Sequence, residues 1–295
     1  MMLGMEFQQL RYVLAVAETR HFTRAAQQLY VAQSALSQQV AKLEGEIGTP
    51  LFVRSSRRVE LTPSGEAFLP WARACLDAAD RAHAEAAAAA GLVTGRLRVG
   101  LIPTTTVVDV PDLVRRLRER HPRVEVQLRV GGSEDLVRKV RADRMDLAMV
   151  GLATGVEPQG VAHRAMSTEA LIAVVPGDHL LAGRERVRLA ELADETFADF
   201  PAGTTGRLQS DRAFHAARLT RRVPYEASTP ELIGSLVTSG LAVALLPRTF
   251  TPAAGCQLLE VTDGPGRTEH LCWSATRPSP ATLAALELLD VSAEA

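Results

Sequence analysis

The sequence is constrained most by residues 22–54, which carry two short amphipathic helical patterns separated by only three residues. The first covers residues 24–29, with Thr23 as its expected N-cap, and the second runs from about residue 33 to residue 47. Residues three and four apart share a helical face, so the second pattern has an apolar side formed by Leu36, Val40 and Leu43. Its other side is rich in Gln and Ser, which a helix that only builds a core does not need. Two helices joined by such a tight turn predict a helix-turn-helix.

The polar side of the second helix is suited to reading DNA. A recognition helix must fit a major groove about 12 Å wide, where Gln binds adenine through two hydrogen bonds and Ser binds several bases or a phosphate. The following segment, VRSSRRVELT, alternates like a small hairpin and would place Arg side chains on phosphate or in the minor groove. The alternative is that Gln and Ser only solvate an exposed helix. The candidate DNA-binding residues are Thr23, Arg24, Gln33, Ser34, Ser37, Gln38, Lys42, Arg54, Arg57 and Arg58.

Overall charge limits how this chain meets nucleic acid. Its 295 residues include 33 Lys and Arg against 34 Asp and Glu, for a net charge of −1. A generally basic coat is therefore excluded, and DNA binding must come from a local patch. The apolar content of 46% is enough for real cores, and the length suits two or three domains.

The cysteines and the apolar stretches indicate where the protein works. Cys75, Cys256 and Cys272 include no CxxC pair, so reduced thiols in a cytoplasm are expected, with a redox switch between Cys256 and Cys272 as the alternative. The start, MMLGMEFQQL, lacks the pattern of a signal peptide, and no stretch approaches the ~20 apolar residues of a membrane span. We expect a cytoplasmic protein with no membrane partner.

Three regions of the chain differ in pattern. Residues 5–62 contain the short helices and the hairpin. Residues 63–91 form one long helix candidate that ends in an Ala tract before Gly91. A stripe at three- and four-residue spacing predicts that this helix pairs with another helix. The stripe consists of Leu69, Ala72, Leu76 and Ala79. The alternative is a linker packed on its own domain.

Residues 95–295 alternate between strand and helix. From RLRVGLI to MDLAMVG the order is strand, helix, strand, helix, strand, which predicts a mostly parallel sheet with right-handed crossovers. The pattern restarts near Ala170 with ALIAVVP. We therefore expect two Rossmann-like α/β lobes, the second covering approximately residues 167–270.

Residues 5–91 resemble the N-terminal half of a LysR-type transcriptional regulator. The resemblance is carried by the ALSQQVAKLE core, the GTPLF turn and the LTPSGE start of the long helix. Farther along, GRLRVGLIPT, MDLAMVG, LIAVVPGDHLLA and VTSGLAVALLP resemble the family's effector domain, whose two lobes are similar to those of periplasmic binding proteins. Two positions depart from the family pattern. Ala32 stands where a Ser usually caps the recognition helix, and Gln38 replaces a frequent Arg.

The resemblance implies a multi-domain fold and a function in transcription. The implied domains are an all-α winged helix-turn-helix (residues 5–62), a linker and dimerisation helix (63–91) and a two-lobed α/β effector-binding domain (95–295). Such a protein regulates transcription by binding DNA and senses a small-molecule effector. Its implied partners are a pseudo-palindromic double-stranded DNA operator, further copies of itself in a homodimer or homotetramer, and RNA polymerase where it activates transcription.

The effector is expected in the loops that follow the strands of the two lobes. Ligands of open α/β lobes bind beyond the carboxyl ends of strands, often at helix N-termini. The candidate effector-binding residues are Thr104, Thr105, Ser133, Phe200, Thr204, Thr205 and Thr229, of which the resemblance carries over Thr104, Ser133, Phe200 and Thr204. Arg207 is the nearest candidate counter-ion for a carboxylate, with a solvent-facing Arg as the alternative. A small organic acid and an amide both remain open as effectors.

Two other functions compete with a regulator. The sequence has scattered His residues but no HExxH, GxSxG or P-loop, so we expect no enzyme, no catalytic residue, and no metal or other cofactor. The second alternative is a solute-binding protein of the periplasmic type without a DNA function. Such a protein would not need residues 5–62.

Overall fold

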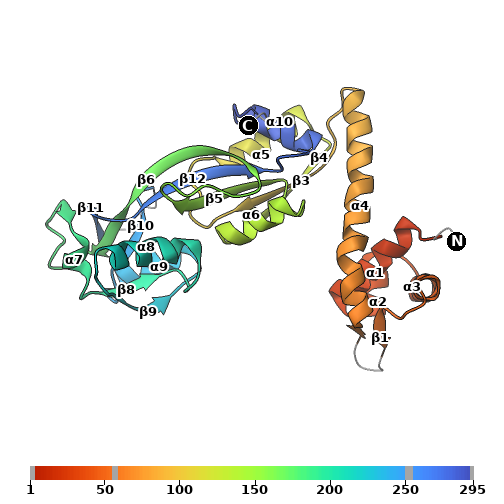
Figure 1. Ribbon diagram of the computed structural model, residues 1–295, viewed down its shortest axis with the longest axis horizontal. Helices are drawn as coiled ribbons and strands as arrows, with labels where there is room; N and C mark the ends of the chain where they lie inside the picture. Colours follow the sequence, from red (N-terminus) through yellow and green to blue (C-terminus); the bar gives the residue numbers. More distant parts are fainter. Residues whose placement is uncertain (1–3, 55–58, 250–254, 293–295) are drawn as a thin grey trace. The chain divides into compact units, whose positions relative to one another are not determined.

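The computed structural model describes residues 4–54, 59–249 and 255–292, and the chain forms two compact units, residues 1–86 and 87–295 (Figure 1). Each unit has its own core. Among the described residues, no helix offers the length of apolar sequence that a bilayer crossing needs.

The first unit is a winged helix-turn-helix followed by a long helix (Figure 1). Its elements are α1 (Phe7–Thr19), α2 (Phe22–Gln28), α3 (Gln33–Ile47), β1 (Phe52–Arg54), β2 (Val59–Leu61) and α4 (Pro63–Ala89), which runs on past the end of this unit. The antiparallel hairpin pairs Phe52 with Leu61. The predicted apolar side of α3 is confirmed, because Leu36, Val40 and Leu43 are fully buried in the core of this unit.

Helix α3 is joined to the hairpin by a fixed turn. The helix ends at Gly48, whose φ of +81° is the left-handed conformation that glycine adopts without strain. Glu44 Oε1 then accepts hydrogen bonds from the backbone N–H groups of Leu51 (2.8 Å) and Phe52 (3.2 Å). The orientation of α3 is therefore tied to the first strand of the wing.

The prediction that Thr23 caps helix α2 is wrong. His21 is the N-cap residue, and its Nδ1 accepts a hydrogen bond from the Thr23 backbone N–H at 3.2 Å. The helix begins earlier because Phe22 is buried in its first turn, against the ring of Phe52 at a centroid distance of 6.0 Å. An apolar contact across the unit has thus set the start of the helix.

The second unit consists of two α/β lobes that share one long sheet. Its strands are β3 (Gly95–Leu101), β4 (Val124–Val130), β5 (Leu147–Ala153), β6 (Ala162–Pro176), β7 (Arg186–Val187), β8 (Thr196–Asp199), β9 (Arg222–Glu226), β10 (Ala244–Pro247), β11 (Cys256–Val261) and β12 (Gly266–Trp273). Its helices are α5 (Val110–Arg120), α6 (Ser133–Arg141), α7 (Leu189–Leu192), α8 (Thr205–Ala216), α9 (Pro230–Thr238) and α10 (Pro280–Leu288).

The first lobe is built on β4, β3 and β5, which are parallel, followed by β12 and the first half of β6 as antiparallel strands. Helices α5 and α10 cover one face of the sheet and α6 covers the other, as their separate core clusters show (Figure 1). The predicted strand–helix–strand run from β3 to β5 is confirmed in its order and its parallel pairing.

The second lobe begins where β6 changes partners. Up to Ala170 this strand pairs with β12, and from Leu171 it pairs with β10 and β11. Strand β12, which ends the stretch expected at residues 167–270, returns to the first lobe beside β5. Two strands, β6 and β12, therefore lie at the junction of the lobes. The short parallel pair β8–β9 and helices α7, α8 and α9 complete the second lobe.

An intramolecular disulfide between Cys256 and Cys272 is excluded by the register of β6. Cys256 pairs with Pro176 and Cys272 pairs with His163, thirteen residues apart on that strand. At ~3.3 Å per residue, the two cysteines lie about 40 Å apart along the sheet, whereas a disulfide needs Cα atoms within about 7 Å.

Candidate DNA-binding helix and effector cavity

The outer face of α3 presents the polar side chains that the sequence singled out. Gln33, Ser34 and Gln38 are exposed, and Ser37 is half-buried beside them. Helical spacing places these four residues within less than half of the helix circumference, away from the buried Leu36. A helix of fifteen residues with such a face matches what the major groove admits.

The other predicted DNA-binding residues have different surroundings. Thr23 and Arg24 are exposed in the first turn of α2. Lys42 is exposed on α3 and pairs with Glu6 at 3.5 Å and with Glu46 at 3.9 Å, so its charge is shared within the unit. Arg57 and Arg58, together with the side chain of Arg54, lie outside the described residues.

The N-terminus of α3 lacks a side-chain cap. Ala32 is the N-cap residue in an extended conformation, and its methyl side chain accepts no hydrogen bond. The departure from the family pattern noted at this position therefore has a structural counterpart. Free N–H groups at a helix N-terminus favour phosphate, so this end of α3 remains available to a DNA backbone.

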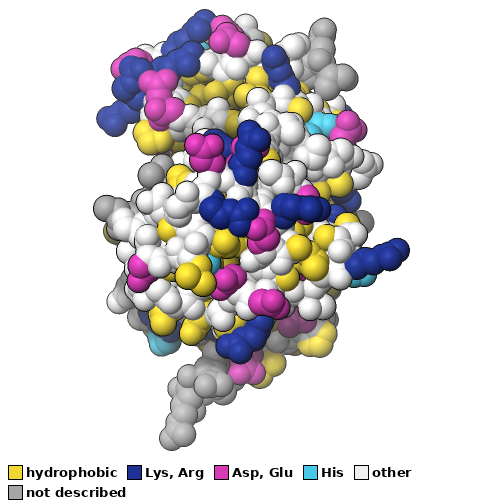
Figure 2. Space-filling view, turned by 90° about the vertical axis from the view of Figure 1, so that its left-hand side faces the viewer, with side chains coloured by type: hydrophobic (Ala, Val, Ile, Leu, Met, Phe, Trp, Pro, Cys, Tyr) yellow, Lys and Arg dark blue, Asp and Glu magenta, His cyan; other side chains and the backbone are white. Residues whose placement is uncertain are grey.

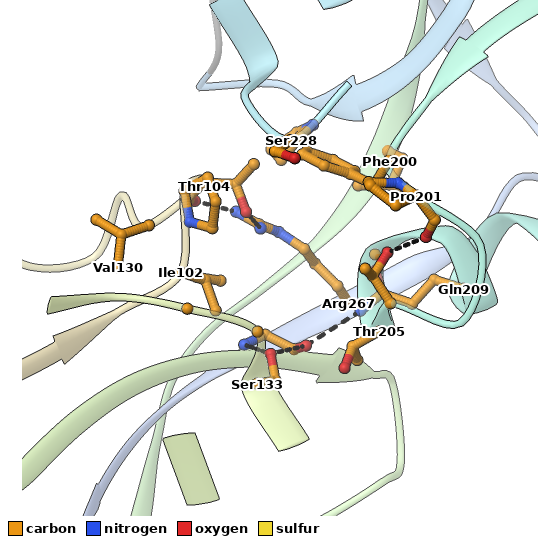
Figure 3. A pocket seen from close by; sticks show the side chains of 18 of the residues that line it. Ile102, Thr104, Val130, Ser133, Phe200, Pro201, Thr205, Gln209, Ser228 and Arg267 are labelled. Atoms are coloured by element: carbon orange, nitrogen blue, oxygen red, sulfur yellow. Dashed lines mark hydrogen bonds between the residues drawn. The ribbon is translucent and has the colours of Figure 1, made fainter. Parts of the chain in front are cut away.

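A cavity of about 320 Å³ lies between the two lobes of the second unit (Figure 3). The first lobe contributes the ends of β3, β4 and β5 and the start of α6, and the second lobe contributes the loop before α8, the first turns of α8 and the segments beside α9 and β10. The lining residues are Ile102, Pro103, Thr104, Val130, Gly131, Gly132, Ser133, Gly151, Leu171, Phe200, Pro201, Thr204, Thr205, Gly206, Gln209, Ser228, Leu245, Pro247 and Arg267.

Five of the seven predicted effector residues line this cavity. They are Thr104, Ser133, Phe200, Thr204 and Thr205. Thr105 and Thr229 do not line it, and each hydroxyl is used within its own turn. Thr105 Oγ1 donates to Ile102 O at 3.1 Å, and Thr229 Oγ1 accepts from the Leu232 N–H at 3.4 Å as the cap of α9. Ser228, the neighbour of Thr229, lines the cavity in its place.

Hydrogen bonds to Gly151 connect lining residues from both lobes. Ser133 Oγ donates to Gly151 O at 3.0 Å and accepts from Gly151 N at 3.2 Å. Gln209 Nε2 reaches the same carbonyl oxygen from the second lobe, at 3.2 Å. Helices α6 and α8, from different lobes, therefore meet at the end of β5 (Figure 3).

Arg267 is a buried lining residue that the sequence did not single out. Its guanidinium contacts Glu169 Oε1 through Nε (3.0 Å) and Nη2 (2.8 Å), and Glu269 Oε1 through Nη2 (2.5 Å). It also donates to Thr104, to Oγ1 at 2.7 Å and to the carbonyl oxygen at 3.0 Å. The alternation of Arg and Glu in RTEHLCW was a signal, since charged residues in an otherwise apolar strand are buried only when paired.

Arg207, the candidate counter-ion, does not line the cavity, and it is not a solvent-facing Arg either, because its side chain is only 14% exposed. Its side chain pairs with Asp211 at 3.0 Å and with Glu226 at 3.1 Å. It also donates to Phe200 O at 3.4 Å and so supports the cavity loop from behind. Asp211 has its pKa lowered because the hydrogen bonds from Arg221 and Arg207 outweigh the opposing effect of burial.

Charges on the outer surface of the second lobe are mixed. Figure 2 views the end of the molecule where α7 and β11 lie, and Lys or Arg side chains alternate there with Asp or Glu. Arg184 pairs with Glu191, Arg186 with Glu260 and Arg188 with Asp263. The described side chains on this face form no broad field of one sign that would attract nucleic acid. Among the described residues, no group of three His, Cys, Asp or Glu side chains is arranged to hold a metal ion.

Comparison with known protein families shows which family the chain belongs to. Residues 7–66 match the family described as the bacterial regulatory helix-turn-helix protein, lysR family, and residues 90–293 match the LysR substrate binding domain. The chain belongs to the LysR family of transcriptional regulators. It is thus a DNA-binding regulator with an effector-binding domain, as the sequence predicted.

Curated relatives of this LysR regulator are themselves regulators. The HTH-type transcriptional regulator ShiR of Corynebacterium glutamicum is 36% identical over 82% of this chain and 82% of its own length. The HTH-type transcriptional regulator IlvR of Caulobacter vibrioides is 32% identical over 97% of both chains. None of these relatives is a solute-binding protein, so the comparisons do not support that alternative.

Solved structures share the same fold. Full-length CbnR complexed with its target DNA has a TM-score of 0.72, at 24% identity over 96% of this chain and 98% of that chain. A full-length OxyR variant from Pseudomonas aeruginosa has a TM-score of 0.66, at 27% identity over 99% of this chain and 97% of that chain. The two-domain architecture of the LysR regulator is therefore shared along its whole length.

Proposed function

We propose that this LysR regulator reads its operator through α3. Gln33, Ser34, Ser37 and Gln38 would contact base edges, while Thr23, Arg24 and Lys42 would contact phosphate with the basic residues of the wing, Arg54, Arg57 and Arg58. The single observation that carries this assignment is the cluster of short polar side chains on the outer face of a helix whose inner face is fully buried.

The assembly and location that we propose are those typical of the family. Helix α4 would pair two chains, and the dimers would join into a homotetramer that presents recognition helices to pseudo-palindromic half-sites about one helical turn apart. The protein would act in the cytoplasm near its own gene and contact RNA polymerase where it activates. Its role would be regulatory rather than catalytic.

We propose further that the cavity between the lobes binds the small-molecule effector. Support comes from its position at the carboxyl ends of β3, β4 and β5 and from its walls, which two lobes provide. A ligand that contacts both walls favours one arrangement of the lobes, because it shifts the population toward the state that it binds better. The rearrangement would change the spacing or the bend of the bound DNA.

A footprint of the full-length protein on the DNA upstream of its own gene tests the recognition face. We expect two protected half-sites spaced by a helical turn, with affinity that falls steeply with salt. Gln33→Ala or Ser37→Ala should weaken operator binding by ~1–3 kcal/mol and leave binding to random DNA nearly unchanged. Gln8→Ala, an exposed glutamine on α1, is the matched control. Equal losses on operator and random DNA would refute the assignment of α3.

A further inference from the structure

The charges around the effector cavity are unfavourable for an anion. Among the described residues that line it, Arg267 is the only Lys or Arg, and its side chain is 3% exposed. Two carboxylates contact it, Glu269 at 1% exposure and Glu169 at 18% exposure. This buried cluster therefore carries one positive and two negative formal charges.

Arg267 also has little hydrogen-bonding capacity left. A guanidinium has five N–H donors, and here those on Nε and Nη2 are taken by Glu169, Glu269 and the Thr104 carbonyl oxygen. One donor on Nη1 is taken by Thr104 Oγ1. A bidentate clamp on a ligand carboxylate needs two parallel N–H groups, and this side chain cannot supply them without breaking its present contacts.

The opposite wall has a similar balance of charge. Behind Phe200, the cations Arg207 and Arg221 pair with three acids. These acids are Asp199, Asp211 and Glu226. Among the described residues, neither wall thus has a cation in excess that would neutralise an organic acid. A carboxylate in the cavity would therefore lose its hydration without gaining a partner of opposite charge.

Helix N-termini provide the opposing influence. Helices α6 and α8 both begin at the cavity, and each N-terminus carries about half a positive charge. In α6, Glu134 and Asp135 in the first turn offset that charge. In α8 the first turn has no acid, so its N–H groups remain attractive to a hydrogen-bond acceptor. An uncharged carbonyl or hydroxyl oxygen can use them without facing two carboxylates.

The other polar atoms that line the cavity favour a ligand with a hydrogen-bond donor as well as an acceptor. Gln209 donates through Nε2 to Gly151 O, which fixes its amide so that Oε1 is left as an acceptor. The Thr205 and Ser228 hydroxyls line the same cavity, and neither bonds to the described parts of the chain. A ligand that carries an N–H or O–H group satisfies Gln209, whereas a carboxylate has no proton to donate.

The size and lining of the cavity limit the size and the polarity of the rest of the ligand. A cavity of about 320 Å³ is roughly twice the ~150 Å³ in which benzene binds, so it takes a ligand of about a dozen non-hydrogen atoms. Its walls are apolar at Ile102, Leu171, Phe200 and Leu245. The body of the ligand must therefore be apolar.

We propose that the cavity selects an uncharged ligand with an apolar body and a carboxamide or hydroxyl group, and that it rejects carboxylates of the same shape. This inference rests on the proposed function of the cavity as the effector site. It narrows the two classes that the sequence left open, organic acids and amides, to the uncharged one.

Calorimetric titration of the full-length protein with matched probes tests the selection. The probes are benzamide and benzoate, phenylacetamide and phenylacetate, and benzyl alcohol. We expect the uncharged member of each pair to bind about tenfold more tightly or better, because like charges in one site are strongly opposed. Glu169→Gln leaves Arg267 with one carboxylate and should reduce that ratio at least threefold. Glu119→Gln, the same change on the exposed face of α5, should leave the ratio unchanged.

A cavity-filling variant, Thr205→Phe, separates the possible failures. Tighter binding of the uncharged probes that is lost in Thr205→Phe supports the inference. Carboxylate binding that is equal or tighter and is lost in Thr205→Phe overturns the inference and leaves the effector cavity in place. Binding that persists in Thr205→Phe overturns the proposed effector cavity itself. If no probe binds even at millimolar concentration, the proposed ligand class is wrong.

Discussion

The guanidinium of Arg221 lies 2.6 Å from Asp199 Oδ2, and both side chains are almost completely buried in the second lobe. Asp211 extends this ion pair toward the surface and accepts a hydrogen bond from Arg221 Nη2 at 2.8 Å. Arg221 also lies over the rings of Phe197 and Phe214, at 5.1 and 5.2 Å from their centroids. Because Asp199 directly precedes the cavity residue Phe200, this pair anchors the loop that forms one wall of the proposed effector cavity.

Removal of Arg221 should therefore destabilise the second lobe. Arg221→Met leaves the Asp199 carboxylate buried without its cation, and we expect a loss of about 3–5 kcal/mol in the free energy of unfolding. The double variant Arg221→Met/Asp199→Leu should recover most of this loss, because no charge is then left buried. Arg222→Met, at the exposed neighbouring position, is the control. Chemical denaturation measures all three, and a loss below about 1 kcal/mol in Arg221→Met would contradict the anchor.

The stability of the first lobe should depend on pH through His270. This side chain is buried, and its pKa is lowered by burial and then by His163, whose ring centroid lies 5.4 Å away. Below about pH 6.5 the unfolded chain binds a proton at this histidine more readily than the folded protein does. The free energy of unfolding should therefore fall as the pH drops below 6.5. Each unit of pKa depression contributes about 1.4 kcal/mol.

Thermal unfolding between pH 7.5 and pH 5.5 measures this dependence. His270→Leu should flatten the profile, whereas His215→Leu, at an exposed position on α8, should keep the wild-type slope. Glu157 opposes the shift by favouring the charged imidazole, so Glu157→Gln should steepen the loss at low pH. Parallel profiles for wild type and His270→Leu would exclude His270 as the cause.

Elements with local patterns were predictable from the sequence. The apolar side of α3 repeats every three or four residues, and the order from β3 to β5 follows from apolar runs that alternate with amphipathic helices. Helix α8 was missed because its buried side carries Gln209 and Ser210 as well as Phe214, so the apolar pattern is broken. The first half of β6 was missed for a related reason, since its polar segment AHRAMSTE is largely exposed or half-buried.

The cavity was only partly predictable because its chemistry depends on distant pairing. Ligands of α/β folds bind beyond the carboxyl ends of strands, and this general rule predicted Thr104, Ser133 and the loop before α8. Arg267 was not found, because its role requires β12 to lie beside β6, where its partner Glu169 is 98 residues away in sequence. The surroundings of Arg207 could not be predicted, because the sequence does not show that Glu226, 19 residues away, pairs with it.

Ala32→Ser should stabilise the recognition helix. The N-cap residue of α3 has the extended conformation that a capping Ser adopts, but its methyl group accepts no hydrogen bond. A Ser hydroxyl there should accept from an N–H of the first turn and add about 1 kcal/mol to the stability of this helix. Hydrogen exchange of the α3 amides in the full-length protein measures the gain. Ala41→Ser, in the exposed interior of the same helix, should give a small loss instead, and equal effects at both positions would argue against capping.

The thiols of Cys75 and Cys272 should differ in reactivity. Burial raises the pKa of Cys272 to about 12, so almost no thiolate forms at neutral pH. Cys75 is exposed on α4 and should be alkylated first in the native protein, whereas Cys272 should react only after unfolding. Mass spectrometry after timed maleimide treatment follows each site, with Cys75→Ser to assign the fast phase. Rapid native alkylation of Cys272 would show that the first lobe opens far more often than its packing implies.

Among the glycines described in the first unit, Gly65 has the least room for a side chain. A Cβ there would collide with the Leu51 carbonyl oxygen and lie 2.9 Å from Leu61 Cδ2, so the first turn of α4 must approach the wing closely. Gly65→Ala should destabilise this unit by about 2–3 kcal/mol and weaken operator binding, because α3 is tied to the same Leu51 through Glu44. Gly45→Ala, in α3 with open space around it, should instead stabilise by about 0.5–1 kcal/mol. Hydrogen exchange of the two full-length variants measures both changes in stability, and their operator affinity measures the effect on DNA binding. Unchanged operator binding in Gly65→Ala would mean that the wing moves away from α4 without disturbing α3.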